Sequence, residues 1–148
     1  MRARTVTLAL LHLAAAAALS ACSQDSIIRF LGPENRPRAT LLPDSFRFEA
    51  YDMENVNNRV AFEWEVTKPY VAFFHRSFIH HGYGLVVIQD AVGTVVDSTI
   101  LDWELDAGSD RPGVPGTWTV NILFSTARGR ADFSLSAQDS IFVPPEKE

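Results

Sequence analysis

The sequence predicts an all-β protein, an antiparallel sandwich of two sheets with about seven to nine strands. Two observations predict this class. From residue 44 onward, apolar and polar residues alternate with a period of two, as they do in strands that bury one face. Turn-forming residues separate the alternating segments at spacings of about ten residues, which is typical of a sandwich. The alternating segments are 46–51, 60–66, 101–106, 117–124 and 130–137.

Turn signals fall between these segments. Residues 52–58 form a polar stretch that predicts a loop. Gly93 can supply the positive φ of a hairpin that joins two valine-rich strands, 85–89 and 94–98. Residues 127–129 predict a similar turn between the last two strands. The Gly- and Pro-rich stretch 107–116 predicts a long loop. Sandwiches present their loops at their ends, so we expect protein partners to bind at loops 52–58 and 107–116.

Segment 70–78 is ambiguous, because its aromatic residues also fit helical spacing after Pro69. Its β-branched and aromatic residues and its strand neighbours favour a strand, which we predict here.

Composition excludes several classes of protein. The 148 residues are 47% hydrophobic and 21% charged, which is ordinary for a globular chain. A formal charge of −5 argues against nucleic-acid binding, which requires a basic surface. The single cysteine, Cys22, excludes an internal disulfide and a thiolate metal cage. We predict no cofactor.

The first residues have the pattern of a signal peptide. Arg2 and Arg4 precede an apolar run from Val6 to Leu19, which is short for a membrane span. The run ends in Leu19-Ser20-Ala21-Cys22, which resembles the lipobox of bacterial lipoproteins. The resemblance implies cleavage before Cys22, lipid on its sulfur, and membrane attachment through that lipid. The residue after the cysteine is Ser23 and not Asp. By the sorting rule of enteric bacteria, this implies the outer membrane, facing the periplasm.

The predicted organisation has four parts: a signal peptide at 1–21, a lipidated tether at 22–43, the sandwich at 44–143 and a tail at 144–148. Three prolines disfavour regular structure in the tether, which would reach at most about 70 Å. Cleavage removes two arginines and no acid, so the formal charge moves from −5 to −7. An acidic body predicts stand-off from an anionic bilayer. An apolar cluster at 27, 28, 30 and 31 either enters the lipid interface, which we favour, or docks on the domain.

The order of the segments resembles that of immunoglobulin-like sandwiches in bacterial lipoproteins of unknown function. The resemblance covers residues 44–137 and is carried by Phe46–Ala50, Phe62–Val66, Ile88–Val96, Pro115–Val120 and Gly129–Leu135. The last hairpins are more weakly similar to Golgi-dynamics β-sandwiches. Neither family carries a catalytic motif. The paired cysteines of true immunoglobulin domains are absent, so Trp64 and Trp118 must pack on apolar neighbours.

Three clusters could carry chemistry. His75, His80 and His81 could hold Zn²⁺ or Cu²⁺ if the chain turns near Gly82, and this metal-binding lipoprotein is the alternative function. Asp102, Glu104 and Asp106 would share one face of a strand about 6.8 Å apart. This spacing favours a solvated stripe over a Ca²⁺ site completed by Asp110. The tryptophans at 64, 103 and 118 could stack on sugars, but their parity places them in the core.

No motif of a nucleophilic, metallo- or phosphate-binding enzyme occurs in the sequence. Ser77 lies near His75 without a third orienting group, and a paired-carboxylate hydrolase stays open. We therefore expect a lipid-anchored envelope protein, not an enzyme, whose sandwich is a binding or structural module.

Overall fold

The computed structural model describes residues 29–102 and 105–144. The predicted signal peptide, Cys22, Trp103 and Glu104 lie outside the described residues. The described chain forms seven strands, and every pair of neighbouring strands is antiparallel. The elements are η2 (Pro33–Asn35), β1 (Arg38–Leu42), β2 (Ser45–Val66), β3 (Tyr70–His75), β4 (Phe78–Gln89), β5 (Val95–Ile100), β6 (Leu105–Gly108) and β7 (Gly116–Gln138).

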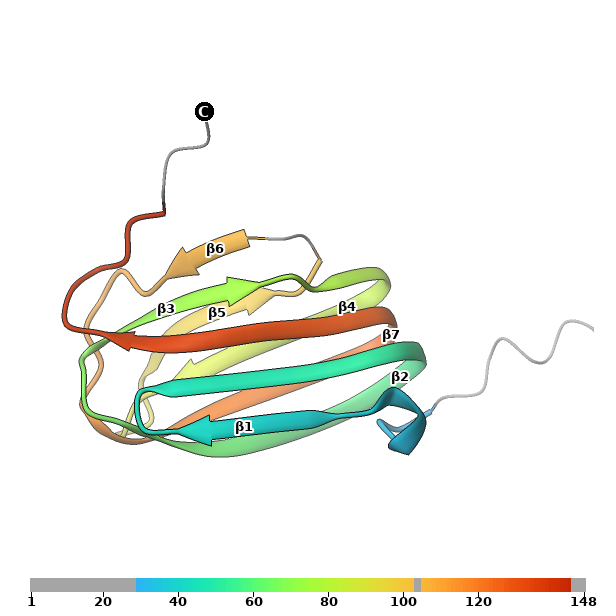
Figure 1. Ribbon diagram of the computed structural model, residues 1–148, viewed down its shortest axis with the longest axis horizontal. Helices are drawn as coiled ribbons and strands as arrows, with labels where there is room; N and C mark the ends of the chain where they lie inside the picture. Colours follow the sequence, from blue (N-terminus) through green and yellow to red (C-terminus); the bar gives the residue numbers. More distant parts are fainter. Residues whose placement is uncertain (1–28, 103–104, 145–148) are drawn as a thin grey trace, which may run out of the picture.

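Two long strands, β2 and β7, run through both layers of a sandwich (Figure 1). In sheet I, residues 45–50 of β2 and 131–136 of β7 pair with each other, and the order is β1-β2-β7-β3-β6. In sheet II, residues 58–66 of β2 pair with 116–124 of β7, which also pairs with β4, and β4 pairs with β5. The predicted all-β antiparallel sandwich is confirmed.

The long strands bend where they pass between the sheets. Register shifts between Ala50 and Asn58 mark the bend in β2, and Asp52 and Asn55 have positive φ there. In β7 the bend lies at Thr126 and Gly129, which also have positive φ. The predicted loop at 52–58 and the predicted turn at 127–129 are therefore wrong, because each segment is the bent middle of one strand.

The two ends of the sandwich differ. We call the end formed by residues 52–57, 76–83 and 125–130 the bend end, on the right in Figure 1. The opposite end, formed by residues 43–44, 67–69, 90–94 and 109–115, is the far end.

The core between the sheets is strongly aromatic. Phe46, Phe48 and Phe73 surround Phe133, whose ring stacks on Phe73 with centroids 5.2 Å apart. Trp64 and Trp118 meet edge to face at 6.1 Å and are fully buried. Such pairs contribute stability beyond their buried area, about 0.5–1.5 kcal/mol each. The tryptophan pair joins β2 to β7 within sheet II through this ring contact.

Residues 29–43 belong to the folded domain, which corrects this part of the predicted tether at 22–43. β1 pairs with β2 from Arg38↔Glu49 to Leu42↔Ser45. The buried Asn35 donates from Nδ2 to the carbonyl oxygens of Tyr51 and Asp52, at 3.2 and 3.0 Å. Pro37 and Pro43 flank β1 on either side, so they do not interrupt its ladder.

Other strand predictions had mixed outcomes. Residues 70–75 form strand β3, as predicted, but the predicted strand 70–78 is interrupted at 76–77, and Phe78 begins β4. The hairpin at Gly93 is confirmed, with φ of +83°. The predicted strand 101–106 is wrong, because β5 ends at Ile100 and β6 begins at Leu105. Within the described residues, none of the helical structure has the length and apolarity needed to cross a membrane.

Candidate binding site

The three histidines are not brought together. His75 is buried, and its ring meets Phe73 edge to face at 5.4 Å. His80 lies at the surface, where its ring faces that of Phe78 at 5.7 Å, and His81 is also exposed. In the described part of the chain, no group of three His, Cys, Asp or Glu side chains could hold a metal ion.

The predicted acidic stripe does not form on one strand. Asp102 is exposed just beyond β5, whereas Asp106 lies in β6 and forms an ion pair with Arg76 at 3.0 Å. Asp110 lies near the far end, where its Oδ1 is 3.5 Å from Arg111 Nε. The predicted stripe requires one continuous strand through residues 101–106, whereas β5 ends at Ile100 and β6 begins at Leu105.

Ser77 has a structural role. Its hydroxyl donates to the backbone oxygen of Asp132 at 3.3 Å and accepts from the backbone N–H of Asp132 at 3.1 Å. It therefore joins the β3–β4 connection to β7. Trp64 and Trp118 lie in the core, as their parity predicts, and each indole N–H donates to a backbone carbonyl, Leu42 and Val114 respectively.

The two predicted contact segments lie at opposite ends of the sandwich. Residues 52–58 belong to the bend end and 109–115 to the far end, so they form no common surface. The far-end loop is held firmly. The buried carboxylate of Asp90 accepts hydrogen bonds from the N–H groups of Val92, Thr94 and Val114. Burial pushes the pKa of Asp90 upward, but these donors outweigh it, so the pKa lies below its usual value.

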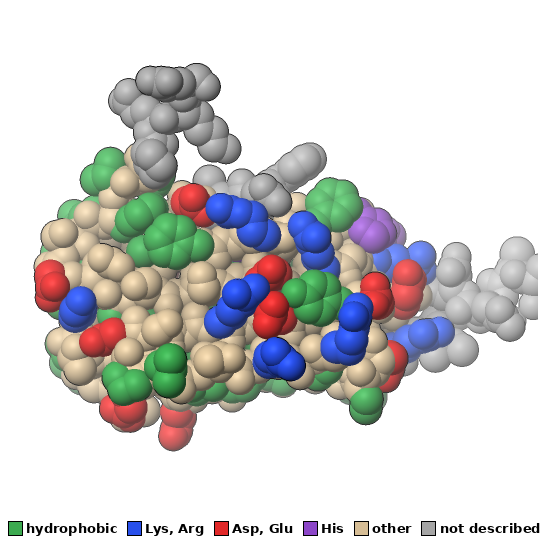
Figure 2. Space-filling model, viewed as in Figure 1, with side chains coloured by type: hydrophobic (Ala, Val, Ile, Leu, Met, Phe, Trp, Pro, Cys, Tyr) green, Lys and Arg blue, Asp and Glu red, His purple; other side chains and the backbone are tan. Residues whose placement is uncertain are grey.

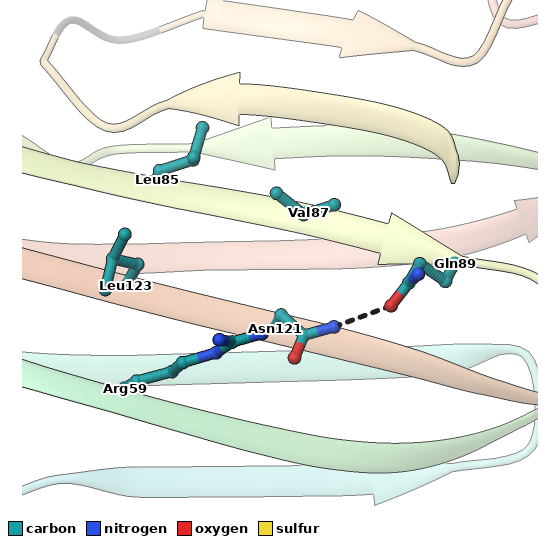
Figure 3. A pocket seen from close by; sticks show the side chains of 6 residues that line it. All are labelled: Arg59, Leu85, Val87, Gln89, Asn121 and Leu123. Atoms are coloured by element: carbon teal, nitrogen blue, oxygen red, sulfur yellow. Dashed lines mark hydrogen bonds between the residues drawn. The ribbon is translucent and has the colours of Figure 1, made fainter. Parts of the chain in front are cut away.

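A hollow of about 290 Å³ lies on the outer face of sheet II (Figure 3). Register brings its side chains side by side: Leu85 pairs with Leu123, which pairs with Arg59 on the edge strand. Val87, Asn121 and Gln89 continue the surface toward the far end, and Asn121 Nδ2 donates to Gln89 Oε1 at 3.0 Å. We call this surface the sheet-face hollow.

The sheet-face hollow combines an aliphatic floor with a cation and two amides. Leu85 and Val87 alternate with the buried Val86 and Ile88, so their side chains face outward and are partly exposed. Among the described residues, no carboxylate lies within 4.0 Å of the Arg59 guanidinium. This surface suits a ligand that has an aliphatic part and an anionic or hydrogen-bonding part. Its six lining residues provide no nucleophile and no general acid or base.

Sequence reasoning did not find this hollow. It depends on which residues of the three strands β2, β4 and β7 lie opposite one another, and that register is not visible in any one segment. A partial signal was present, since Leu85, Val87 and Leu123 place apolar side chains on the parity that faces solvent.

The fold and the site together define a small β-sandwich module. No family model and no curated protein matches the sequence. Among solved structures, the chain is similar to a protein from work titled "Bacillus endospore appendages form a novel family of disulfide-linked pili". That match has 15% identity and a TM-score of 0.37, and covers 70% of this chain and 92% of the other. It is also similar to PirA, with 11% identity and a TM-score of 0.31, over 69% of this chain and 93% of PirA.

Proposed function

We propose that this chain is a lipid-anchored bacterial envelope protein whose β-sandwich acts as a non-catalytic binding or structural module. The observation that carries the proposal is Leu19-Ser20-Ala21-Cys22 at the end of the apolar run from Val6 to Leu19. Each buried methylene contributes about 0.8 kcal/mol, and one acyl chain alone holds only weakly. Several chains on Cys22 would give durable attachment.

The start of the folded domain supports an anchored arrangement. Arg29 already bonds to the bend in β2, where its N–H donates to Asn55 O at 3.0 Å and its carbonyl accepts from Asn57 N–H at 2.8 Å. Seven peptide steps from Cys22 to Arg29 span at most about 25 Å. The lipid would therefore hold the sandwich close to the bilayer, much closer than the tether predicted from sequence.

The chemistry of the exposed surface supports the non-catalytic part of the proposal. The sheet-face hollow offers aliphatic, amide and guanidinium groups, which bind but do not transfer protons at neutral pH. The buried His75 packs against Phe73, and the Ser77 hydroxyl bonds to the backbone of Asp132. Both side chains therefore stabilise the β3–β4 region. We place the protein in the outer membrane facing the periplasm, on the basis of Ser23.

Metabolic labelling with palmitate tests the anchor. The wild-type chain should incorporate label into a membrane-bound product, and Cys22→Ala should lose both the label and the membrane association. Ser23→Ala, which keeps the lipobox, is the matched control and should remain labelled. Label that persists in Cys22→Ala, or its absence from the wild type, would refute the proposal. Ser23→Asp, expressed in an enteric host, should move the labelled protein from the outer to the inner membrane.

A further inference from the structure

Exposed aromatic side chains occur at only one end of the described structure. Three of its large exposed apolar residues are aromatic: Phe30, Phe78 and Tyr83, which are 73%, 51% and 45% exposed. All three lie at the bend end, because Phe30 follows the Arg29 bridge to Val56, Phe78 pairs with Arg130, and Tyr83 pairs with Ser125. The other large exposed apolar residues are aliphatic. Aromatic rings favour the interface between lipid and water.

Charge is also distributed unevenly along the molecule. Arginines are frequent around the bend, whereas acids outnumber basic residues toward the far end. Figure 2 shows blue and purple side chains toward the right, where the strands bend, with red side chains between them. Near the bend, the basic side chains are Arg29, Arg36, Arg59, Arg76, Arg128 and Arg130, and the acids are Glu34, Asp52, Glu54, Asp102 and Asp106. Toward the far end, the acids are Asp44, Glu63, Glu65, Asp90, Asp97, Asp110 and Asp139, and the basic residues are Lys68 and Arg111.

Local contacts hold the arginines at the bend. Arg128 Nε donates to Asn55 Oδ1 at 3.0 Å, and Arg130 Nε donates to the carbonyl oxygen of Arg76 at 3.1 Å. A groove of about 640 Å³ beside Phe78 is lined by Arg130 and His80 and also by two acids, Asp52 and Glu54. The bend end thus presents exposed rings next to positioned cations and an open groove.

The chain enters the domain at this same end. Of the apolar cluster predicted near the lipid, Leu31 packs against the core and Phe30 is exposed, and residues 27 and 28 lie outside the described residues. Given an anchor at Cys22, at most about 25 Å of chain separates the lipid from Arg29. A bilayer is therefore the surface that the bend end meets first.

We propose that the bend end rests on the membrane surface, with Phe30, Phe78 and Tyr83 in the headgroup layer and the surrounding arginines facing lipid phosphates. This inference rests on the proposed lipid anchor. It replaces the stand-off predicted from the net charge, because the excess negative charge lies at the far end, more than a Debye length (about 8 Å at physiological salt) from the lipid. The far end would then face away from the anchor.

Site-directed spin labelling of the lipidated full chain tests this orientation. The only native cysteine carries the lipid, so a cysteine introduced by Phe78→Cys or Tyr83→Cys is the single reactive thiol. Val92→Cys, at the exposed turn of the far end, is the matched control. Each labelled protein is placed in vesicles of phosphatidylethanolamine and phosphatidylglycerol, and collisions with oxygen and with a water-soluble nickel complex are measured. Thermal unfolding checks that each variant keeps the parent fold.

We expect the labels at 78 and 83 to collide severalfold less with nickel, relative to oxygen, than the label at 92. Equal nickel accessibility at all three positions would overturn the inference and indicate a domain that stands off or uses its rings for a protein partner. Shielding of position 92 alone would indicate the opposite orientation and would also overturn it. Mass spectrometry of Cys22 before reconstitution separates these results from failure of the anchor itself, which would show as an unacylated cysteine.

Discussion

At the scale of single residues, the bends depend on backbone conformations that few side chains allow. Gly129 has φ of +131°, and a Cβ there would lie 2.0 Å from the carbonyl oxygen of Phe78. Gly93 also has positive φ, at +83°, but a Cβ there meets nothing within 4 Å. The two glycines therefore separate the cost of the backbone conformation from the cost of a steric clash.

We expect Gly129→Ala to lower the free energy of unfolding by at least about 3 kcal/mol, because strain and clash act together. Gly93→Ala should cost about 1–2 kcal/mol, the cost of a positive φ alone. Urea denaturation of both variants, with the slope compared to that of the parent, measures the difference. Equal losses in the two variants would show that Phe78 moves aside freely.

The sequence predicts a turn at both Gly93 and Gly129, but only Gly93 lies in one. Gly93 does form a hairpin turn. Gly129 instead allows close contact between β7 and β4 at a bend inside a strand. A glycine indicates that a positive φ can occur at its position. It does not indicate whether the chain reverses direction there.

At the scale of elements, alternation located most of the strands, but not the way that β2 and β7 connect the sheets. The polar composition of residues 52–58 predicts a loop, and Asp52 and Asn55 do have the positive φ values that a hairpin loop uses, but within a strand. The overlooked signal was Met53 and Val56, which are apolar and fully buried within that polar stretch. A loop at the surface would have left them in water.

Asp90 joins two elements and gives a prediction with a defined pH dependence. Its carboxylate connects the β4–β5 turn to the 109–115 loop through the N–H of Val114, at 2.9 Å. Asp90→Asn replaces one acceptor oxygen with an NH₂ group, so one N–H donor loses its partner. The expected loss of unfolding free energy at pH 7 is about 1–3 kcal/mol.

The pH dependence follows from the lowered pKa of Asp90 in the folded protein. A carboxyl group in the unfolded chain titrates near pH 4, so the ionised form stabilises the fold above about that pH. The stabilisation is lost as the pH falls through the lower folded-state pKa. The stability difference between the parent and Asp90→Asn should therefore shrink in acid, as measured by urea denaturation between pH 7 and 3. Asp139→Asn, at an exposed carboxylate, should change stability by less than about 0.5 kcal/mol throughout. A gap for Asp90→Asn that stays constant down to pH 3 would contradict this account.

At the scale of the whole molecule, the sequence predicts the layered architecture. It does not predict the N-terminal boundary of the domain, the distribution of charge or the sheet-face hollow. The prolines before Asp44 predict an unpaired tether, although an edge strand lies between two of them. A net charge predicts repulsion from every side, although in the fold the excess of acids over basic residues lies toward the far end. The sheet-face hollow arises only from the register of β2, β7 and β4. Each of these features depends on pairing between distant segments, which local patterns do not encode.

The corrected outline of the domain makes the final prediction. A chain that begins at Arg29 keeps β1 and the hydrogen bonds of Asn35, whereas one that begins at Asp44 lacks both. In the shorter chain, Trp64 Nε1 loses its acceptor, the carbonyl of Leu42, and residues 45–49 of β2 become an unpaired edge. We expect a loss of at least about 3 kcal/mol of unfolding free energy and a tendency to aggregate through that edge. Urea denaturation and gel filtration of the two chains measure both effects. If the chain from Asp44 were monomeric and unfolded at the same urea concentration as the chain from Arg29, the boundary predicted from sequence would be correct, and β1 would be dispensable.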